Sequence, residues 1–307
     1  MLTTMDVTTR VAFTRVVDRF VTFGLNNSEY IIKLIDGLGP VKAEYTTVGS
    51  ATDAGGLNLD PRDVQRNIVV TFGFAPKRGT GNTVESLRQA LYAFLMPKKQ
   101  VELGFTNDVT GRWLIKGAVE THEPDIFSKD PQVQVSILCG DPYFYKDAPD
   151  VVYQIPFIDS GTSASEYFVL PYENDVPVGF VYEGNLRLSS SFLRLFMNAF
   201  PSNTLPPEGV AELWQARFEI DYQFAVNDFL RISSVRGDRG AWRFIGGNMN
   251  SKMSLMPYFS GSLVNMQLHP NGPINFRNVP TNYSGNSHGR PLVNGGVIRY
   301  KRATGGL

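Results

Sequence analysis

The stretch QVQVSILCGDPYFY, residues 132–145, decides the fold of the region in which it lies. Valines and an isoleucine alternate with glutamines and a serine at its start, a period of two that is typical of a strand with one buried face. Gly140 and Asp141 followed by Pro142 end the strand, because proline has no amide donor and biases the preceding residue toward an extended or turn conformation. The aromatic residues that follow anchor the chain as it leaves. The sequence therefore predicts the closing strand of a domain.

Composition sets limits on the class of protein. The 307 residues are enough for two domains. The 29 Lys and Arg balance the 29 Asp and Glu without long runs of like charge, which argues against a surface that grips nucleic acid. The single cysteine excludes an internal disulfide, and no secretion signal is recognisable, so we expect cytoplasmic synthesis. No apolar run approaches the roughly 20 residues that cross a bilayer, so we expect no membrane insertion.

The first half reads as a sheet with one helix. The 21 Phe, 13 Tyr, 29 Gly and 19 Pro favour strands and turns. Short apolar segments at residues 20–24 and 30–35 predict a hairpin, and residues 41–61 predict a long irregular loop. A β-branched strand is expected at residues 67–74. A second hairpin is expected around residues 107–111.

The expected helix follows residues 79–81. Asn82 is placed as its N-cap with Glu85 reaching back to the cap, and Pro97 lies beyond its end. An apolar face predicts that the helix packs on the sheet. That face consists of Val84, Leu87, Leu91, Phe94 and Leu95.

The second half predicts a β-sandwich after a change of composition around residues 161–165. Short strands at a spacing of about 8 to 12 residues are typical of this architecture. The expected strands are residues 167–170, 178–182, 185–188, 192–197, 213–222, 229–235, 241–245, 263–268 and 296–300. Residues 192–200 are open to a short helix instead. Residues 271–287, rich in Asn, Gly and Pro, predict an irregular arm.

No reactive constellation is visible. The sequence Gly79-Thr80-Gly81 lacks the rest of a phosphate-binding loop and is interpreted as a tight turn. Pro124 breaks any metal-ligand spacing among His122, Glu123 and Asp125, and we interpret these residues, with His269 and His288, as solvated turns. Cys139, beside Asp141, is not expected to form a thiolate. We therefore predict no catalytic residue, no cofactor-binding residue and no metal ligand.

Three other groups of residues leave alternatives open. Four carboxylates leave room for an acid/base pair of the glycosidase kind; they are Glu166, Glu173, Asp175 and Glu183. Either Trp214 or Trp242 would stack on a sugar if exposed, although buried Trp is more common. The arginines around residues 237–240 predict a solvated hairpin tip, or else a subunit contact. They are Arg231, Arg236, Arg239 and Arg243.

The order of these elements resembles the distal tail proteins of siphophages. In that family a strand opening with Arg, a helix ending at Pro, a Leu-x-Phe-x-Asn-Asp strand and a closing Cys-x-Asp-Pro-Tyr-Phe-Tyr occur in sequence. Here the corresponding segments are residues 66–74, the helix 84–95 closed by Pro97, residues 101–108, the returning strand from Trp113, and residues 139–145. The second half is similar to the family's galectin-like sandwich, on the residues around Asn174 and Asp175 and on residues 228–240 and 268–276. It departs from the family pattern in lacking a Gly before Asp175.

This resemblance implies a mainly β fold: a ring-forming domain at residues 1–148, described as a β-sandwich or barrel-like sheet with one helix, and a galectin-like sandwich at residues 149–307 with an irregular C-terminal arm. It implies a structural virion protein of the phage tail tip and not an enzyme. The chain would form a homo-hexamer that joins the tail tube protein to the tip or baseplate hub protein, with receptor-binding proteins as further partners. DNA would pass through the bore without specific binding. A carbohydrate-binding protein is the alternative, and a glycosidase the third.

Overall fold

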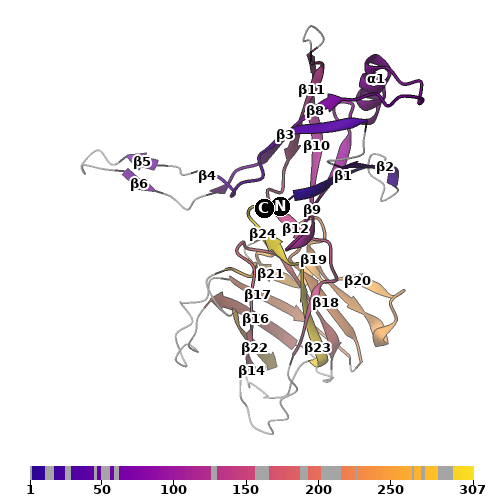
Figure 1. Ribbon diagram of the computed structural model, residues 1–307. Helices are drawn as coiled ribbons and strands as arrows, with labels where there is room; N and C mark the ends of the chain where they lie inside the picture. Colours follow the sequence, from indigo (N-terminus) through magenta and orange to yellow (C-terminus); the bar gives the residue numbers. More distant parts are fainter. Residues whose placement is uncertain are drawn as a thin grey trace. The chain divides into compact units, whose positions relative to one another are not determined.

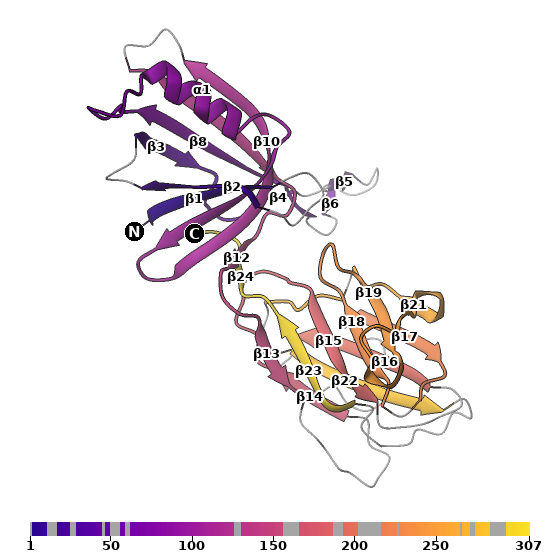
Figure 2. The same ribbon diagram turned by 90° about the vertical axis from the view of Figure 1, so that its right-hand side faces the viewer.

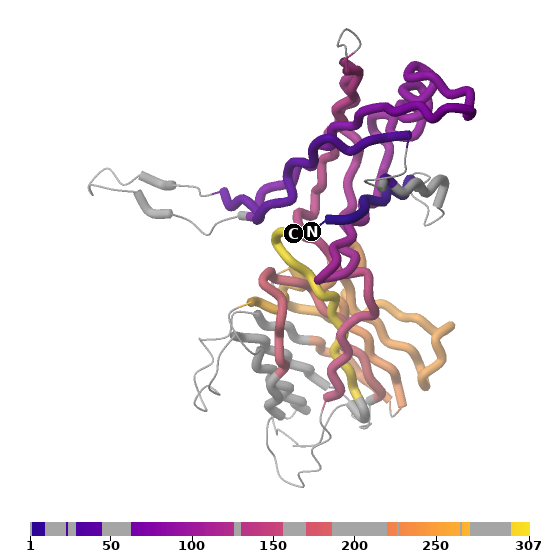
Figure 3. Tube along the Cα trace, in the orientation of Figure 1, coloured from indigo at the N-terminus to yellow at the C-terminus, as the bar shows by residue number. Residues whose placement is uncertain are grey.

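The computed structural model shows two compact units, Met1–Asp147 with Thr304–Leu307 and Ala148–Ala303. The residues it describes are 2–10, 17–24, 29–44, 47–49, 56–58, 62–125, 130–155, 166–186, 193–201, 216–225, 227–264, 266–270, 274–282 and 293–307. Figure 3 shows this path along the Cα trace.

Unit 1 is built on one curled antiparallel sheet (Figures 1 and 2). Its main strands run in the order β2-β1-β9-β10-β11-β8-β3. Their bounds are β1 Leu2–Arg10, β2 Val17–Gly24, β3 Tyr30–Asp36, β8 Arg66–Phe74, β9 Gln100–Asn107, β10 Gly111–Asp125 and β11 Gln132–Cys139. A short strand, β12 (Phe144–Lys146), pairs with β10 and with β24 (Ala303–Thr304).

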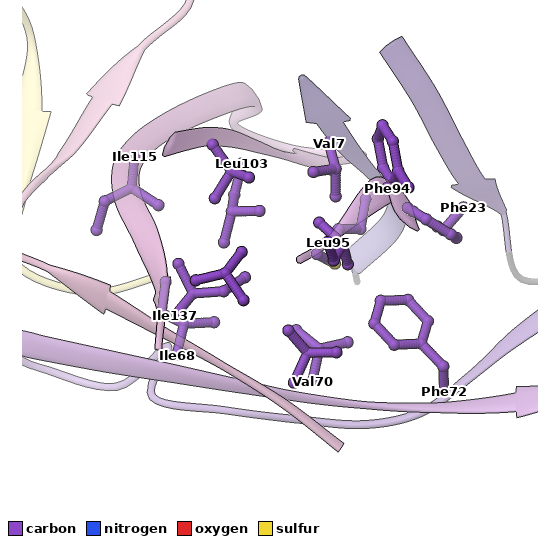
Figure 4. Packing of buried hydrophobic residues seen from close by; sticks show 14 of the residues in the cluster. Val7, Phe23, Ile68, Val70, Phe72, Phe94, Leu95, Leu103, Ile115 and Ile137 are labelled. Carbon is purple, nitrogen blue, oxygen red and sulfur yellow. The ribbon is translucent and has the colours of Figure 1, made fainter. Parts of the chain in front are cut away.

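The core of unit 1 lies on the concave side of this sheet and includes the face of α1 (Val84–Phe94). Alternate residues of β8 and β11 are buried, as the period of two predicted; Ile68, Val70, Val133 and Val135 are each 0% exposed. Leu91 of α1, at 1% exposed, belongs to the same cluster. Figure 4 shows Leu95 and Phe94 among the side chains of the strands. The predicted packing of the helix on the sheet is confirmed.

The start of α1 differs from the prediction by one residue. Thr83 is the N-cap: its hydroxyl accepts from the amide of Ser86, and the Ser86 hydroxyl accepts from the amide of Thr83. The expected cap, Asn82, instead donates to the carboxylate of Glu29 at 2.8 Å. The sequence offers two capping boxes that differ by one residue, Asn82 with Glu85 and Thr83 with Ser86. The hydrogen bond of Asn82 to Glu29 leaves Thr83 as the cap.

The predicted hairpin of residues 20–24 and 30–35 is wrong. Strands β2 and β3 are consecutive in the chain, but β2 pairs with β1 and β3 pairs with β8, at opposite ends of the sheet. The curl of the sheet brings side chains from these two ends together. The ring of Phe23 lies 5.8 Å from that of Tyr30 and 5.0 Å from that of Phe72. β2 and β3 therefore contact each other through aromatic side chains and not through the main-chain pairing of a hairpin.

Residues 41–61, expected to be an irregular loop, contain strands that form an arm. The arm is two short antiparallel ladders in series: β4 (Ala43–Glu44) pairs with β7 (Arg62–Asp63), and β5 (Thr47–Gly49) pairs with β6 (Gly56–Asn58). The sequence does not predict this hairpin, because each ladder is too short to produce an alternating apolar pattern and the residues around it are mostly glycine and polar. In contrast, the predicted hairpin around residues 107–111 is confirmed, with Asn107 opposite Gly111.

Unit 2 is a pair of antiparallel sheets, ordered β13-β23-β15-β18-β19-β20 and β14-β22-β16-β17-β21. The first contains β13 Val151–Gln154, β15 Phe180–Leu186, β18 Phe229–Ser233, β19 Gly240–Phe244, β20 Lys252–Ser254 and β23 Val293–Tyr300. The second contains β14 Glu166–Leu170, β16 Leu193–Pro201, β17 Ala216–Tyr222, β21 Phe259–Gly261 and β22 Ile274–Asn282. Two 3-10 turns are η2 Ile245–Gly247 and η3 Met256–Tyr258. Buried side chains come from both sheets, among them Tyr182, Ile298 and Ile220, as a sandwich requires.

Four predictions for unit 2 need correction. The irregular arm expected at residues 271–287 contains β22, which pairs with both β14 and β16 although it includes Pro280. Two paired neighbours outweigh the poor strand propensity of its Asn and Pro residues. The alternative helix at residues 192–200 is wrong, because β16 lies there. Residues 178–182 and 185–188 were expected to be two strands, but β15 runs through Gly184. Among the described residues of the range 263–268, Leu268 alone forms a bridge, to Val178.

Candidate functional site

Arg66, the first residue of β8, is the centre of a buried junction in unit 1. Its guanidinium donates four hydrogen bonds to main-chain carbonyls: Nε to Pro142 at 2.7 Å, Nη1 to Gly37 at 2.5 Å and Gly39 at 2.6 Å, and Nη2 to Gly305. The side chain is 7% exposed, and burial lowers its pKa. We call Arg66 and these four carbonyls the Arg66 junction.

The junction explains why the closing motif and the opening arginine belong together. The Asp141 carboxylate accepts from the Tyr145 hydroxyl at 2.9 Å, which shapes the turn and presents the carbonyl of Pro142 to Arg66. The guanidinium lies 4.7 Å from the centre of the Phe144 ring, which is fully buried, so a cation–π contact adds to the hydrogen bonds. The segment 141–145, predicted as the point where the chain leaves the strand, thus positions Arg66 through the carbonyl of Pro142 and the ring of Phe144.

Glycine is required on the other side of the junction. Gly37 has φ 87°, and a Cβ there would lie 2.1 Å from the carbonyl oxygen of Asn67. Residues 304–307 fill the remaining side: the Leu307 amide donates to the carbonyl of Leu38 at 2.9 Å. The predicted strand at residues 296–300 lies in β23 of unit 2, and residues 304–307 belong to unit 1.

The junction also fixes the root of the arm. Residues 37–42 lead into β4, and β7 leads through Val64 into Arg66. The Val64 amide donates to the carbonyl of Lys42 at 3.0 Å, and the Tyr143 hydroxyl donates to the Asp63 carboxylate. The closing motif therefore contacts β7 through Tyr143, and the hydrogen bond between Val64 and Lys42 joins the two sides of the arm where they leave the sheet.

The turn at residues 79–81 and the residues beside it bind the side-chain carboxylate of Glu29. The Glu29 carboxylate accepts from the Lys77 amide, the Thr80 hydroxyl and the Asn82 side chain, and these contacts lower its pKa. Gly79 and Gly81 have φ 91° and 71°. The interpretation of this segment as a tight turn is confirmed: the Thr80 amide donates to the carbonyl of Lys77.

His122 is not the solvated turn that the sequence predicted. It lies within β10 opposite Val135, so it points to the same face as the core. Its ring packs edge-on against Tyr92 of α1 at 5.0 Å, and neither ring nitrogen has a hydrogen-bond partner among the described residues. Burial lowers its pKa. Glu123 and Asp125 are exposed, His269 is half-buried, and His288 lies outside the described residues.

The structure describes the surroundings of most of the other candidate reactive groups. Cys139 is fully buried, and burial raises the pKa of its thiol to about 12. Glu183 binds Arg231 and Arg299, each at 3.1 Å, and Glu173 binds Arg302 at 3.0 Å. Asp175 is exposed. The side chain of Glu166 and all of Trp214 lie outside the described residues.

The arginine group forms paired contacts along the β18–β19 hairpin. Arg231 binds Glu183 and Asp238, and Arg243 binds Asp228 at 2.6 Å. The guanidinium of Arg231 and the ammonium of Lys252 lie 5.0 and 4.5 Å from the Trp242 ring centre. The hairpin is confirmed, but its base is ion-paired and partly buried, and cations already contact the Trp242 ring.

A hollow in unit 2 was missed by the sequence reasoning. It has a volume of about 900 Å³ and lies where β17 and the residues after it meet β19, η3 and β21. Tyr222, Tyr258 and Arg243 are among its lining residues. These residues are far apart in the sequence and form no motif, so no signal in the sequence identifies the hollow.

Two other features are absent from the described part of the chain. No group of three or more His, Cys, Asp or Glu there is placed to hold a metal ion. No helix there has the length and apolar character to span a membrane.

Comparisons with known proteins bear on the fold. No protein-family model matches the chain, and no curated protein matches its sequence. The crystal structure of the Dit protein of phage SPP1, described as a paradigm of the hub adsorption apparatus in phages that infect Gram-positive bacteria, is 14% identical with a TM-score of 0.57, covering 90% of this chain and 93% of that one. The phage P2 baseplate in its activated conformation with calcium is 12% identical with a TM-score of 0.48, covering 98% of each chain. The first similarity shows that this chain has the fold of a phage distal tail hub protein, as the order of its motifs predicted.

Proposed function

We propose that this chain is a structural hub protein of a bacteriophage tail tip, which assembles as a hexameric ring. The fold shared with the SPP1 Dit protein across both units carries the proposal. The ring joins the tail tube protein to the tip or baseplate hub protein, and receptor-binding proteins dock on it. The protein is therefore part of the virion, at the distal end of the tail.

A closed ring needs two different patches on each subunit, and the structure offers three candidate surfaces. The first is the arm, β4 to β7, whose root is held by the Arg66 junction. The second is the tip of the β9–β10 hairpin, where Val109 is 87% exposed. The third is β3, which pairs on one side only within the described residues and exposes Ile31 and Leu34. An edge strand with exposed apolar side chains is a template for pairing with another chain.

The bore of the ring lets DNA pass without specific binding. A formal net charge of zero supports this, because cations clustered on a bore would hold DNA through the release of counterions. A role without catalysis is supported by the buried thiol of Cys139 and the ion-paired carboxylates of Glu173 and Glu183. The galectin-like description of unit 2 remains part of the proposal; two packed antiparallel sheets support it.

Native mass spectrometry and particle imaging of the purified chain, alone and in isolated tail tips, test the proposal. We expect six copies around one axis. Leu34→Asp should weaken assembly, because it places a charge on the exposed β3 edge. Val152→Asp is the matched control, since Val152 is 44% exposed on β13 of unit 2. A monomer in both settings, or a two-fold dimer, would overturn the ring.

A further inference from the structure

We infer that the hollow of unit 2 binds a neutral saccharide. Its lining combines aromatic rings, of which that of Tyr258 is exposed, with a small set of polar groups in the same volume of about 900 Å³. That combination, an apolar wall with a few placed donors and acceptors, is typical of small-ligand sites. The inference concerns unit 2 alone and does not depend on the ring.

Tyr222 and Tyr258 form the aromatic wall. Their rings meet edge to face at 4.6 Å and 63°, and Tyr258 is 43% exposed. Phe224 packs against Tyr222 from behind at 5.3 Å and is itself buried. The wall therefore has one fixed ring and one ring open to the hollow. Such a ring offers a flat apolar face to the C–H face of a pyranose.

The polar groups of the lining suit hydroxyls. Arg243 has five N–H donors, of which the bonds to Asp228 and to the Tyr222 hydroxyl use two. Gln223 both donates and accepts, and Asp221 contributes a carboxylate to the lining. A sugar hydroxyl donates one hydrogen bond and accepts others, so it matches a lining that contains both kinds of group.

The charges of the lining favour a neutral ligand over an anionic one. Arg243 is the cation of the lining, and Asp228, which is fully buried, pairs with it at 2.6 Å. With Asp221 also present, the site has no excess of positive charge. Phosphate and carboxylate ligands need unpaired donors of positive charge, whereas a saccharide needs none.

The site is held in place by hydrogen bonds that do not involve a ligand. The Asp228 carboxylate accepts from the amides of Ala225 at 2.7 Å and Gly246 at 3.0 Å, in addition to Arg243. The Tyr222 hydroxyl accepts from Arg243 at 3.0 Å. These contacts fix the position of Arg243 and Tyr222 before binding, which lowers the entropic cost of holding a ligand.

Saturation-transfer NMR on the full chain tests the inference with neutral oligosaccharides as probes: maltotetraose, cellotetraose, mannotetraose and chitotetraose, extended by an array of neutral glycans. An anionic arm uses glycerol phosphate and a sulfated tetrasaccharide. We expect transfer to at least one neutral oligosaccharide. Tyr258→Ala should weaken its affinity by about tenfold or more, whereas Tyr258→Phe, which keeps the ring, should stay within about threefold.

Tyr92→Ala is the matched control, because Tyr92 is 48% exposed in unit 1, far along the chain from the hollow. It should leave the affinity unchanged, and melting curves of each variant verify folding. Absence of transfer to every neutral glycan would overturn the inference. So would transfer that Tyr258→Ala leaves unchanged, or binding confined to the anionic probes.

Discussion

Replacing Arg66 by methionine removes the centre of the Arg66 junction while keeping a long apolar stem in its place. The change deletes four hydrogen bonds from a charged donor to the carbonyls of Gly37, Gly39, Pro142 and Gly305. It also removes the cation above the Phe144 ring. Methionine fills part of the volume, so the loss is mainly polar.

The expected loss of stability is about 3 kcal/mol. Hydrogen bonds to charged groups contribute about 1.5 to 3 kcal/mol each, so four at the low end give about 6 kcal/mol. Two effects reduce this sum. Desolvation of the buried guanidinium, which lowers the pKa of Arg66, no longer opposes folding, and water reaches some of the freed carbonyls. For a unit of this size, about 3 kcal/mol corresponds to a fall in Tm of about 6 to 12 °C.

Scanning calorimetry and urea unfolding check this value, with the transitions of the two units analysed separately. Arg302→Met is the control, because Arg302 is half exposed and forms one ion pair, with Glu173; we expect a change of about 1 kcal/mol or less. Arg66→Lys should be intermediate, since an ammonium cannot reach all four carbonyls. A loss for Arg66→Met no larger than for the control, or a loss confined to unit 2, would refute the reasoning.

Three further predictions concern buried residues of unit 1. Leu91→Ala should destabilise it by about 2 to 5 kcal/mol, measured by urea unfolding, because Leu91 is 1% exposed in the core; a change near zero would contradict the packing of α1. The Cys139 thiol should resist iodoacetamide at pH 8 in the native protein and react once urea unfolds it. Because burial raises the pKa of this thiol from about 9 to about 12, the contribution of the protonated thiol to stability is complete below pH 9 and declines as the pH rises toward 12. The variant Cys139→Ala should therefore lose less stability than the parent protein between pH 9 and pH 12. The lowered pKa of His122 means that stability is complete above pH 6.5 and declines as the pH falls below it; His122→Phe should show a smaller fall in Tm between pH 7.5 and 5, and an equal fall would point to other groups.

Local patterns in the sequence determined the elements whose form is specified by a few neighbouring residues. The apolar face of the helix, the alternation at residues 132–137 and the hairpin around residues 107–111 all specify their structure within a few residues. The order of the motifs predicted the fold that the similarity to the SPP1 Dit protein shows. The sequence predicted that Asp141 disfavours a thiolate at Cys139; the pKa of this thiol is raised, and burial is the main cause, with Asp141 adding to it.

Tertiary structure decided everything that depends on partners far along the chain. The Arg66 guanidinium binds the carbonyl of Gly305, 239 residues away, and no local pattern at either residue predicts the contact. Strands β2 and β3 separate because pairing with β1 and β8 outweighs a short turn. The same competition makes a central strand of β22 in spite of Pro280.

The hollow follows the same rule. Tyr222, Arg243 and Tyr258 come from three elements, and only the fold brings them together. The sequence fixes side-chain chemistry and short-range geometry, because these depend on a few covalently linked residues. Pairing between distant segments depends on the total burial and hydrogen bonding of the whole unit. The sequence of one segment does not contain this information.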